Sequence, residues 1–296
     1  MTARRRLLRA FYRGTYVAGL PFRDGGITIL SYHSIDANGT PLSVSPGLFA
    51  AQMATLAAEG CATFTMSQVA QHLGERKPFP PRAVAITFDD GFSSVAEIAL
   101  PLMRRFGLKA TVYVITGMVG RTTRWTDGGK PLPSLRILGW DQIEQLHGAG
   151  VEIGAHTATH GFLTQYADAE LTDELDAPRE VLRARLGAPV SAFAYPQGDY
   201  DRRVVNAVRA TGYSTATTVD QGRVRLNDDP FLLPRLLVSN NTTPAVLRAF
   251  TVPSIGPAYR LINLVIRGFM GRKQWPRRKP GEVDSTGSVP ISEAGL

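Results

Sequence analysis

Ala83-Val84-Ala85-Ile86-Thr87-Phe88-Asp89-Asp90-Gly91 joins a short apolar run to two acids and a glycine. An apolar run of this length is typical of a strand that is buried on both faces, as in a parallel sheet covered by helices. Two carboxylates at the end of such a strand would lie at the carboxyl edge of the sheet, where the active sites of parallel barrels form. Because Asp and Gly are also favoured in turns, Asp89 and Asp90 are either a candidate site or a simple turn.

The same strand-then-helix unit recurs on both sides of residues 83–91. Apolar runs predict seven strands, at Ile27–Tyr32, Ala83–Phe88, Ala110–Ile115, Val151–Gly154, Val190–Tyr195, Tyr213–Thr217 and Phe231–Val238. Amphipathic patterns predict helices from Pro46 onward and at Val95–Phe106, Asp141–Ala149, Ala169–Leu186 and Arg202–Thr211. This alternation predicts an α/β fold, a closed or nearly closed (β/α) barrel of about seven parallel strands, as a single domain over residues 25–252.

The composition excludes several classes of protein. The chain has 296 residues, of which 44% are hydrophobic and 20% charged, so it is neither a disordered polymer nor a disulfide-stapled miniprotein. Cys61 is the only cysteine, so any metal must bind through His, Asp or Glu. No run approaches the roughly 20 apolar residues of a membrane-spanning helix. Arg9 and Arg13 interrupt what would be the apolar part of a signal peptide, so we expect a cytoplasmic protein.

The formal net charge of +8 is concentrated near the two ends of the chain. Residues 1–23 contain six arginines and no acid, and residues 260–280 contain seven basic residues and no acid. Residues 24–259 are close to neutral, with 20 basic and 22 acidic side chains. A nearly neutral body lacks the basic groove that nucleic-acid binding requires, so we expect no nucleic-acid partner.

The two ends divide into three segments. Residues 1–24 form a basic extension, residues 253–275 a basic amphipathic helix, and residues 276–296 a disordered tail rich in Pro, Gly, Ser and charge. The apolar face of the amphipathic helix carries Tyr259, Ile262, Val265, Ile266 and Phe269. Such a face either packs on the barrel or rests on an anionic membrane surface, where each basic residue contributes on the order of 1 kcal/mol. The second alternative predicts peripheral attachment to the inner face of the membrane.

Two of the five histidines lie four residues apart, in His156-Thr157-Ala158-Thr159-His160, directly after a predicted strand. On a helical turn this spacing would point both imidazoles to one side. Two imidazoles and one carboxylate from Asp89-Asp90 make a three-ligand site that suits zinc and leaves positions open for water and substrate. The alternative is a pair of unrelated surface or capping histidines.

A third motif, Phe193-Ala194-Tyr195-Pro196-Gln197-Gly198-Asp199, also follows a predicted strand. Pro196 and Gly198 favour one fixed loop, whose backbone N–H groups could face a reacting oxygen. Taken alone, this segment is only a good turn.

In this order, the three motifs resemble those of the polysaccharide deacetylase family, the carbohydrate esterases of family 4 that share the NodB homology domain. The resemblance covers roughly residues 25–250. It implies a distorted (β/α) barrel and metal-dependent hydrolysis of N-acetyl groups from N-acetylhexosamine units of a polysaccharide or lipid-linked sugar.

The same resemblance implies roles for individual residues. Asp90, His156 and His160 would bind a divalent metal, Zn²⁺ first, with Ni²⁺ or Co²⁺ as alternatives. Asp89 would act as the general base on a metal-bound water, which is the nucleophile. The loop at Tyr195, Pro196 and Gln197 would contact the substrate, and the N–H of Gln197 would stabilise the oxyanion.

One departure from the family pattern concerns the acid that protonates the leaving amine. Many members use a late histidine, but no histidine follows His160. The remaining candidate is His33, in Tyr32-His33 at the end of the first predicted strand. The Tyr32-His33 motif resembles that of the branch that deacetylates exopolysaccharide N-acetylglucosamine, where an early Tyr-His motif supplies the acid. The first and last strands of a closed barrel are neighbours, so a histidine after the first strand can replace one after the last. The alternative is that His33 is a buried structural histidine.

A second departure concerns the arginine that orients the base in many members, because Ala194 stands at its position. Arg235, in Leu233-Pro234-Arg235, could pair with Asp89 instead. The alternative is an exposed arginine in a loop.

Three functions are compatible with these motifs. The first is N-deacetylation of a glycan or glycolipid. The second uses the same residues on another acyl group, as an O-acetyl esterase or a deformylase. The third is a catalytically silent carbohydrate-binding domain, against which the intact set of Asp89, Asp90, His156 and His160 argues.

Overall fold

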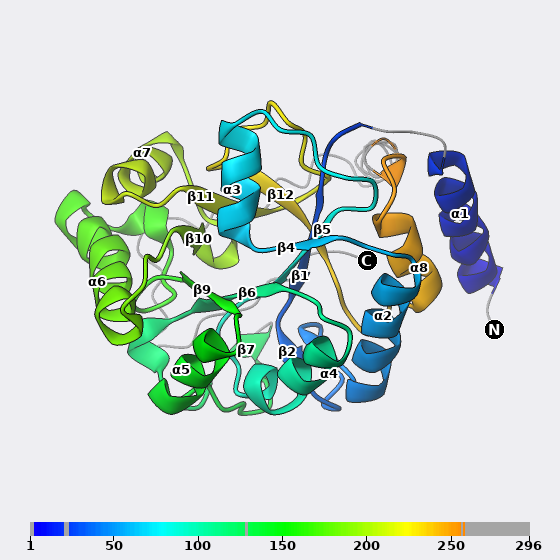
Figure 1. Cartoon of the computed structure of the whole chain (residues 1–296). Coiled ribbons are helices and arrows are strands. Elements are labelled where there is room, and N and C mark those ends of the chain that lie inside the picture. Colours follow the sequence, from blue (N-terminus) through cyan, green and yellow to red (C-terminus); the bar gives the residue numbers. More distant parts are fainter. Residues whose placement is uncertain (1–2, 21–23, 128–129, 256, 258–296) are drawn as a thin grey trace.

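The computed structural model describes residues 3–20, 24–127, 130–255 and 257. Within this part, seven parallel strands close into a barrel in the order β1-β12-β11-β10-β9-β6-β5, and β5 pairs back to β1 (Figure 1). The prediction of a (β/α) barrel is therefore confirmed. The strands are β1 (Thr28–Tyr32), β5 (Val84–Phe88), β6 (Ala110–Val114), β9 (Glu152–Ala155), β10 (Ala192–Ala194), β11 (Thr215–Gln221) and β12 (Leu233–Leu237).

Helices cover the outside of the barrel (Figure 1). The predicted ones are α2 (Pro46–Ala58), α4 (Leu100–Arg105, after a π-helical turn at Val95–Ala99), α5 (Trp140–Gly148), α6 (Asp168–Leu186) and α7 (Arg202–Thr211). The sequence analysis missed α8 (Pro244–Phe250), because seven residues are too few for a clear periodic pattern. Its start nevertheless has a cap, since the Thr243 side chain accepts the N–H of Val246, and a proline at the first helical position.

The amino-terminal end of the barrel is closed by two elements that the sequence analysis also missed, β4 (Thr63–Phe64) and α3 (Met66–Gly74). The first N–H groups of α3, at Met66 and Ser67, donate to the carboxylate of Glu152 on β9. The apolar side of α3 packs with Ile29, Ala85 and other side chains of the barrel interior. Access to the interior is thus left to the opposite end, where the strands terminate.

Alternation along the strands separates an inner from an outer core. Leu30, Ile86 and Val112 point outward and join the cluster under the helices, whereas Ile29 and Ala85 point inward. Towards the carboxyl ends of the strands the inward positions become polar, at Ser31, Thr87, Thr217 and Arg235. This change in polarity prepares the carboxyl end of the barrel for a polar site.

The loops at or near this end contain short strands and 3₁₀ turns. They are β2 (Ser34–Ile35) and β3 (Ser43–Val44), β7 (Thr126–Asp127) and β8 (Lys130–Pro131), and 3₁₀ turns at Thr116–Met118, Leu163–Gln165 and Pro196–Gly198. A long connection between β6 and α5 carries an apolar cluster in which Trp125 packs with Phe92, Ile115 and Ile137. Phe92 follows β5 closely in the chain, so this cluster lies near the carboxyl end of that strand.

The amino-terminal extension contains helix α1 (Ala3–Gly19), which lies beside α8 at one edge of the molecule (Figure 1). The rings of Tyr12 and Phe250 meet edge to face at 6.2 Å, and the Ser254 hydroxyl donates to the Thr15 carbonyl. Val17, on the other side of α1, is 58% exposed. The predicted amphipathic helix (253–275) lies outside the described residues except for 253–255 and 257, and the predicted tail (276–296) lies wholly outside them. None of the helices in the described part could span a bilayer.

Candidate active site

Asp89 and Asp90 directly follow β5 and are both buried, with 3% of each residue exposed. Asp90 and Gly91 follow one another in the left-handed backbone region, at φ 69° and 71°. Two such residues turn the chain sharply, so the two adjacent carboxylates meet different partners. Asp89 faces an arginine, and Asp90 faces two histidines.

Asp90, His156 and His160 converge on one point. The Oδ1 atom of Asp90 lies 3.3 Å from the Nε2 atom of each histidine. One potential ligand atom from each residue lies within 4.8 Å of the others, and all three residues are buried. Burial alone would raise the pKa of Asp90, but the hydrogen bonds from His156 and His160 outweigh it and hold that pKa well below its usual range. The cluster therefore contains an ionised carboxylate.

The two histidines do not lie on a helix, so the expected helical turn was wrong. Residues 156–160 form a loop after β9, and Thr157 and His160 adopt left-handed backbone conformations, at φ 68° and 67°. The hydroxyl of Thr157 accepts the N–H of His160 inside this loop. The two rings nevertheless lie close together, with their centroids 4.9 Å apart.

The surroundings of the histidines fit a metal site. His156 Nδ1 lies 2.8 Å from the carbonyl oxygen of Ala194, which leaves Nε2 directed at Asp90. Metal-binding histidines are commonly oriented in this way, through a hydrogen bond from the other ring nitrogen. The ring of His160 stacks on Trp125 at a centroid distance of 5.6 Å. Two imidazole nitrogens and one carboxylate oxygen make a donor set that suits Zn²⁺ and related divalent ions.

Asp89 forms a bidentate ion pair with Arg235, at 2.6 and 2.7 Å. Arg235 lies on β12 with 2% of its surface exposed, and its Nε donates to the carbonyl of Thr218, so it is not an exposed loop residue. Burial would raise the pKa of Asp89, but the charge of Arg235 and its hydrogen bonds lower that pKa below its usual range. The pair keeps a buried carboxylate ionised beside the cluster of Asp90, His156 and His160.

His33 follows β1 and lies on the same side of the barrel. Its Nε2 atom is 3.9 Å from the Oδ2 atom of Asp89, and 15% of its side chain is exposed. Burial lowers the pKa of His33 despite the attraction of Asp90 and Asp89. Because β1 pairs with both β5 and β12, the barrel brings His33, Asp89 and Arg235 together from three strands.

The loop after β10 holds the third group of predicted site residues. Tyr195 does not contribute a donor to the site, because its hydroxyl donates to the Phe231 carbonyl and its N–H donates to the Thr217 carbonyl. Pro196 has no N–H to donate and is buried. Gln197 adopts a left-handed conformation at φ 56°, and its buried Nε2 has no partner in the described part of the chain. Of the three residues, Gln197 is the one whose side chain has an unpaired donor among the described residues.

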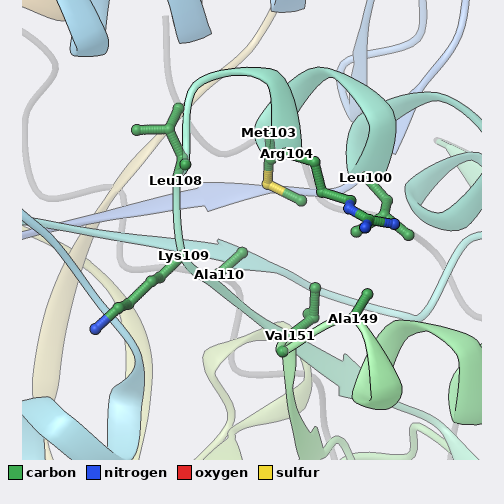
Figure 2. A pocket seen from close by; sticks show the side chains of 10 residues that line it. Leu100, Met103, Arg104, Leu108, Lys109, Ala110, Ala149 and Val151 are labelled. Atoms are coloured by element: carbon green, nitrogen blue, oxygen red, sulfur yellow. The ribbon is translucent and has the colours of Figure 1, made fainter.

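A hollow of about 260 Å³ lies elsewhere on the molecule, between α4 and the turn that leads from α5 to β9 (Figure 2). Leu100, Met103, Leu108 and Val151 line it, and no Asp, Glu or His does. It lies towards the amino-terminal ends of β6 and β9, the end opposite the acids and histidines. This hollow therefore carries none of the chemistry described above.

Comparison with known proteins agrees with this geometry. The family model described as polysaccharide deacetylase matches residues 76–216, which include the motifs of Asp89-Asp90 and His156–His160. In sequence over this range, and in fold, the chain resembles the polysaccharide deacetylase family. A relative from Staphylococcus epidermidis, poly-beta-1,6-N-acetyl-D-glucosamine N-deacetylase, is 23% identical over 215 residues, or 70% of this chain and 71% of that protein.

Solved structures resemble this chain over most of its length. IcaB from Ammonifex degensii superposes with a TM-score of 0.66 and 25% identity, covering 77% of this chain and 97% of that one. The Streptococcus pyogenes deacetylase PplD, solved with acetate, has a TM-score of 0.68 and 24% identity, covering 77% of this chain and 99% of that one. The similarity to PplD supports the barrel fold alone.

Two residues around the histidines were missed by sequence reasoning. Trp125 lies in the long connection before α5, where no periodic pattern marks it, and it stacks on His160. Glu174 lies on the buried face of α6, between Leu171 and Leu175, and contacts the loop between the two histidines. An acid within an apolar helical stripe is a signal that could have identified Glu174.

Proposed function

We propose that this protein is a metal-dependent N-deacetylase of N-acetylhexosamine units in a polysaccharide or glycolipid. The observation that carries the proposal is the cluster of Asp90, His156 and His160 beside the buried Asp89–Arg235 pair, in a chain that matches the polysaccharide deacetylase model over residues 76–216. The Staphylococcus epidermidis relative, named for poly-beta-1,6-N-acetyl-D-glucosamine, supports an N-acetylated sugar polymer as the substrate class.

Asp90, His156 and His160 would hold the metal, for which the donor set favours Zn²⁺, with Ni²⁺ and Co²⁺ as alternatives. When bound, such an ion supplies Lewis acidity for the attack of water on the amide carbonyl. The low pKa of Asp90 keeps its carboxylate ionised before a metal binds, and the Ala194 carbonyl holds the ring of His156 in position. The chain thus supplies ligands that need little rearrangement.

Proton transfer is assigned to Asp89 and His33. Arg235 keeps Asp89 ionised, so Asp89 can accept a proton from the attacking water as a general base. His33 is our candidate for the acid that gives a proton to the leaving amine, because its Nε2 atom lies 3.9 Å from the Asp89 carboxylate, beside the proposed base. The loop at Gln197 follows the strand whose Ala194 carbonyl binds His156, and it is our candidate for donating to the developing oxyanion.

Chelation is expected to abolish activity on acetylated glucosamine oligomers. Acetate release should fall to background after treatment with a chelator, because Lewis-acid activation is lost, and should return when Zn²⁺ or Co²⁺ is added. Acetate, formate and free amine are measured in parallel. Release of formate, or of acetate from O-acetyl esters alone, would indicate the other acyl substrates. Oligosaccharide binding without any product would indicate the silent binding domain.

We further propose that the basic ends of the chain attach the enzyme to the inner, anionic face of the membrane. Thirteen basic residues lie in residues 1–23 and 260–280 without any acid. The hydrogen bond from Ser254 to Thr15 supports a joint role, because it holds the chain that precedes residues 260–280 beside α1. Exposed Val17 and Leu20 add apolar surface at this edge. Such attachment would bring the enzyme close to a lipid-linked or growing glycan.

Sedimentation with liposomes tests this attachment. Binding to vesicles that contain anionic lipid is expected to exceed binding to neutral vesicles and to weaken as salt is raised, because salt screens exposed charges beyond about 10 Å at 0.1 M. Deletion of residues 253–296 should weaken it further. Equal binding to neutral and anionic vesicles, or no effect of the deletion, would contradict the proposal.

A further inference from the structure

The loop that carries both histidines adopts a backbone that its own sequence does not favour. Thr157 and His160 lie in the left-handed region, at φ 68° and 67°, although neither is glycine and Thr157 is β-branched. Such conformations persist only where the surroundings enforce them, and they cluster at functional sites. The contacts that hold this loop therefore also hold the two histidine rings.

On one side, the loop is held by the chain that follows β6. The N–H groups of Thr116 and Gly117 donate to the carbonyls of Thr157 and Ala158, at 3.2 and 2.9 Å. A Cβ atom at Gly117 would lie 2.5 Å from the Ala158 carbonyl oxygen, so only glycine permits this approach. These bonds satisfy two carbonyl groups of the loop and leave the N–H groups of Ala158 and Thr159 for another partner.

That partner is Glu174 on α6. Its Oε2 atom accepts the N–H groups of Ala158 and Thr159, both at 3.0 Å, and its Oε1 atom accepts the Thr159 hydroxyl at 2.8 Å. A carboxylate accepts several hydrogen bonds and donates none, which matches three converging donors. All three donors lie between His156 and His160.

Glu174 is buried, with 7% of its surface exposed, and its hydrogen-bond partners in the described part of the chain are all neutral groups. Burial of a carboxylate without a cationic partner is unfavourable unless hydrogen bonds compensate it. Among the described residues, all the hydrogen bonds that compensate the burial of Glu174 come from the histidine loop. Glu174 thus couples the packing of α6 to the conformation of this loop.

We infer that Glu174 is a positioning residue for the metal site: it fixes residues 156–160 so that the Nε2 atoms of His156 and His160 meet at Asp90. The inference rests on the proposed function in so far as these residues bind a metal. Glu174 contacts neither imidazole, so it acts through the backbone of the loop. Groups that orient metal ligands in this way typically contribute about 10- to 100-fold in metal affinity.

The test is titration of the metal-free protein with Co²⁺, followed by visible absorption, which reports the ligands and their geometry. Glu174→Leu is expected to weaken Co²⁺ binding about 10- to 100-fold and to change the absorption spectrum. Glu174→Gln keeps one acceptor oxygen for the two backbone N–H groups, so its loss should be smaller. Acetate release by Glu174→Leu should recover largely at saturating Co²⁺, with an unchanged KM, because Glu174 does not touch the substrate.

Glu170→Leu is the matched control. Glu170 lies one turn earlier on α6 and also accepts a backbone N–H, that of Ala167, but contacts no residue of the histidine loop. It should affect thermal stability without changing Co²⁺ affinity. If Glu174→Leu does not fold, Glu174→Asp decides the matter, because it keeps the charge and shortens the reach by one methylene group.

Co²⁺ titration of the wild type separates failure of the inference about Glu174 from failure of the proposed function. If the wild type binds Co²⁺ and the folded Glu174 variants bind it equally tightly with the same spectrum, the role of Glu174 is overturned while the proposed function stands. If the wild type itself binds no divalent metal, the proposed function fails, and the inference about Glu174 fails with it.

Discussion

Asp89→Asn is expected to lower the rate of acetate release by about 10²- to 10⁴-fold, the usual contribution of a general base. Asparagine has the size of aspartate and can still accept a hydrogen bond from Arg235, but it cannot take a proton from water. Affinity for Co²⁺ should stay close to that of the wild type, because Asp89 faces Arg235 and not the two histidines. Acetate release and Co²⁺ titration are measured on the same preparation.

The neighbouring carboxylate provides the matched comparison. Asp90→Asn should lose Co²⁺ affinity together with activity, because Asp90 Oδ1 lies 3.3 Å from both imidazoles. A thermal melt of each variant separates loss of function from loss of fold. Full activity in Asp89→Asn, or loss of Co²⁺ affinity equal to that of Asp90→Asn, would show that the two roles have been assigned wrongly.

Arg235→Met is expected to lower the free energy of unfolding by about 3–5 kcal/mol, the usual cost of removing one partner from a buried ion pair. It leaves Asp89 buried without its two hydrogen bonds from the guanidinium group. Activity should fall as well, because an uncompensated carboxylate at this position is harder to keep ionised. Urea denaturation and acetate release at a fixed pH measure the two effects.

The double variant Asp89→Asn/Arg235→Met gives the sharper test of this ion pair. Neither charge is then left without a partner, so the double variant should be more stable than the sum of the two single losses predicts. Arg235→Lys keeps the charge but not the bidentate geometry, and it should fall between the wild type and Arg235→Met. Additive losses would indicate that Asp89 and Arg235 stabilise the fold independently.

Much of the barrel could be predicted because its strands are local features. Each buried strand is a run of apolar residues, and the runs at Val84–Phe88 and Ala110–Val114 form β5 and β6 close to their expected bounds. The elements that were missed are short or act through distant contacts. The helix α3, for example, begins where Glu152, far along the chain, accepts the N–H groups of Met66 and Ser67.

The candidate site shows the same division. The motifs of Asp89-Asp90 and His156–His160 could be read directly, since each is contiguous and follows a strand. The backbone of the histidine loop could not, because its left-handed residues are held by Glu174 and by the N–H groups of Thr116 and Gly117. None of these partners is adjacent to the loop in the chain.

The sequence by itself determined the alternation of strands and helices, the acids and histidines at strand ends, and the concentration of basic charge near the ends of the chain. Only the tertiary structure decided that Asp89 pairs with Arg235, that His33 lies beside them, and that Tyr195 is engaged within the fold. The physical reason is that side-chain patterns reflect the local period of each element, whereas these contacts depend on barrel closure and on register between strands far apart in the chain.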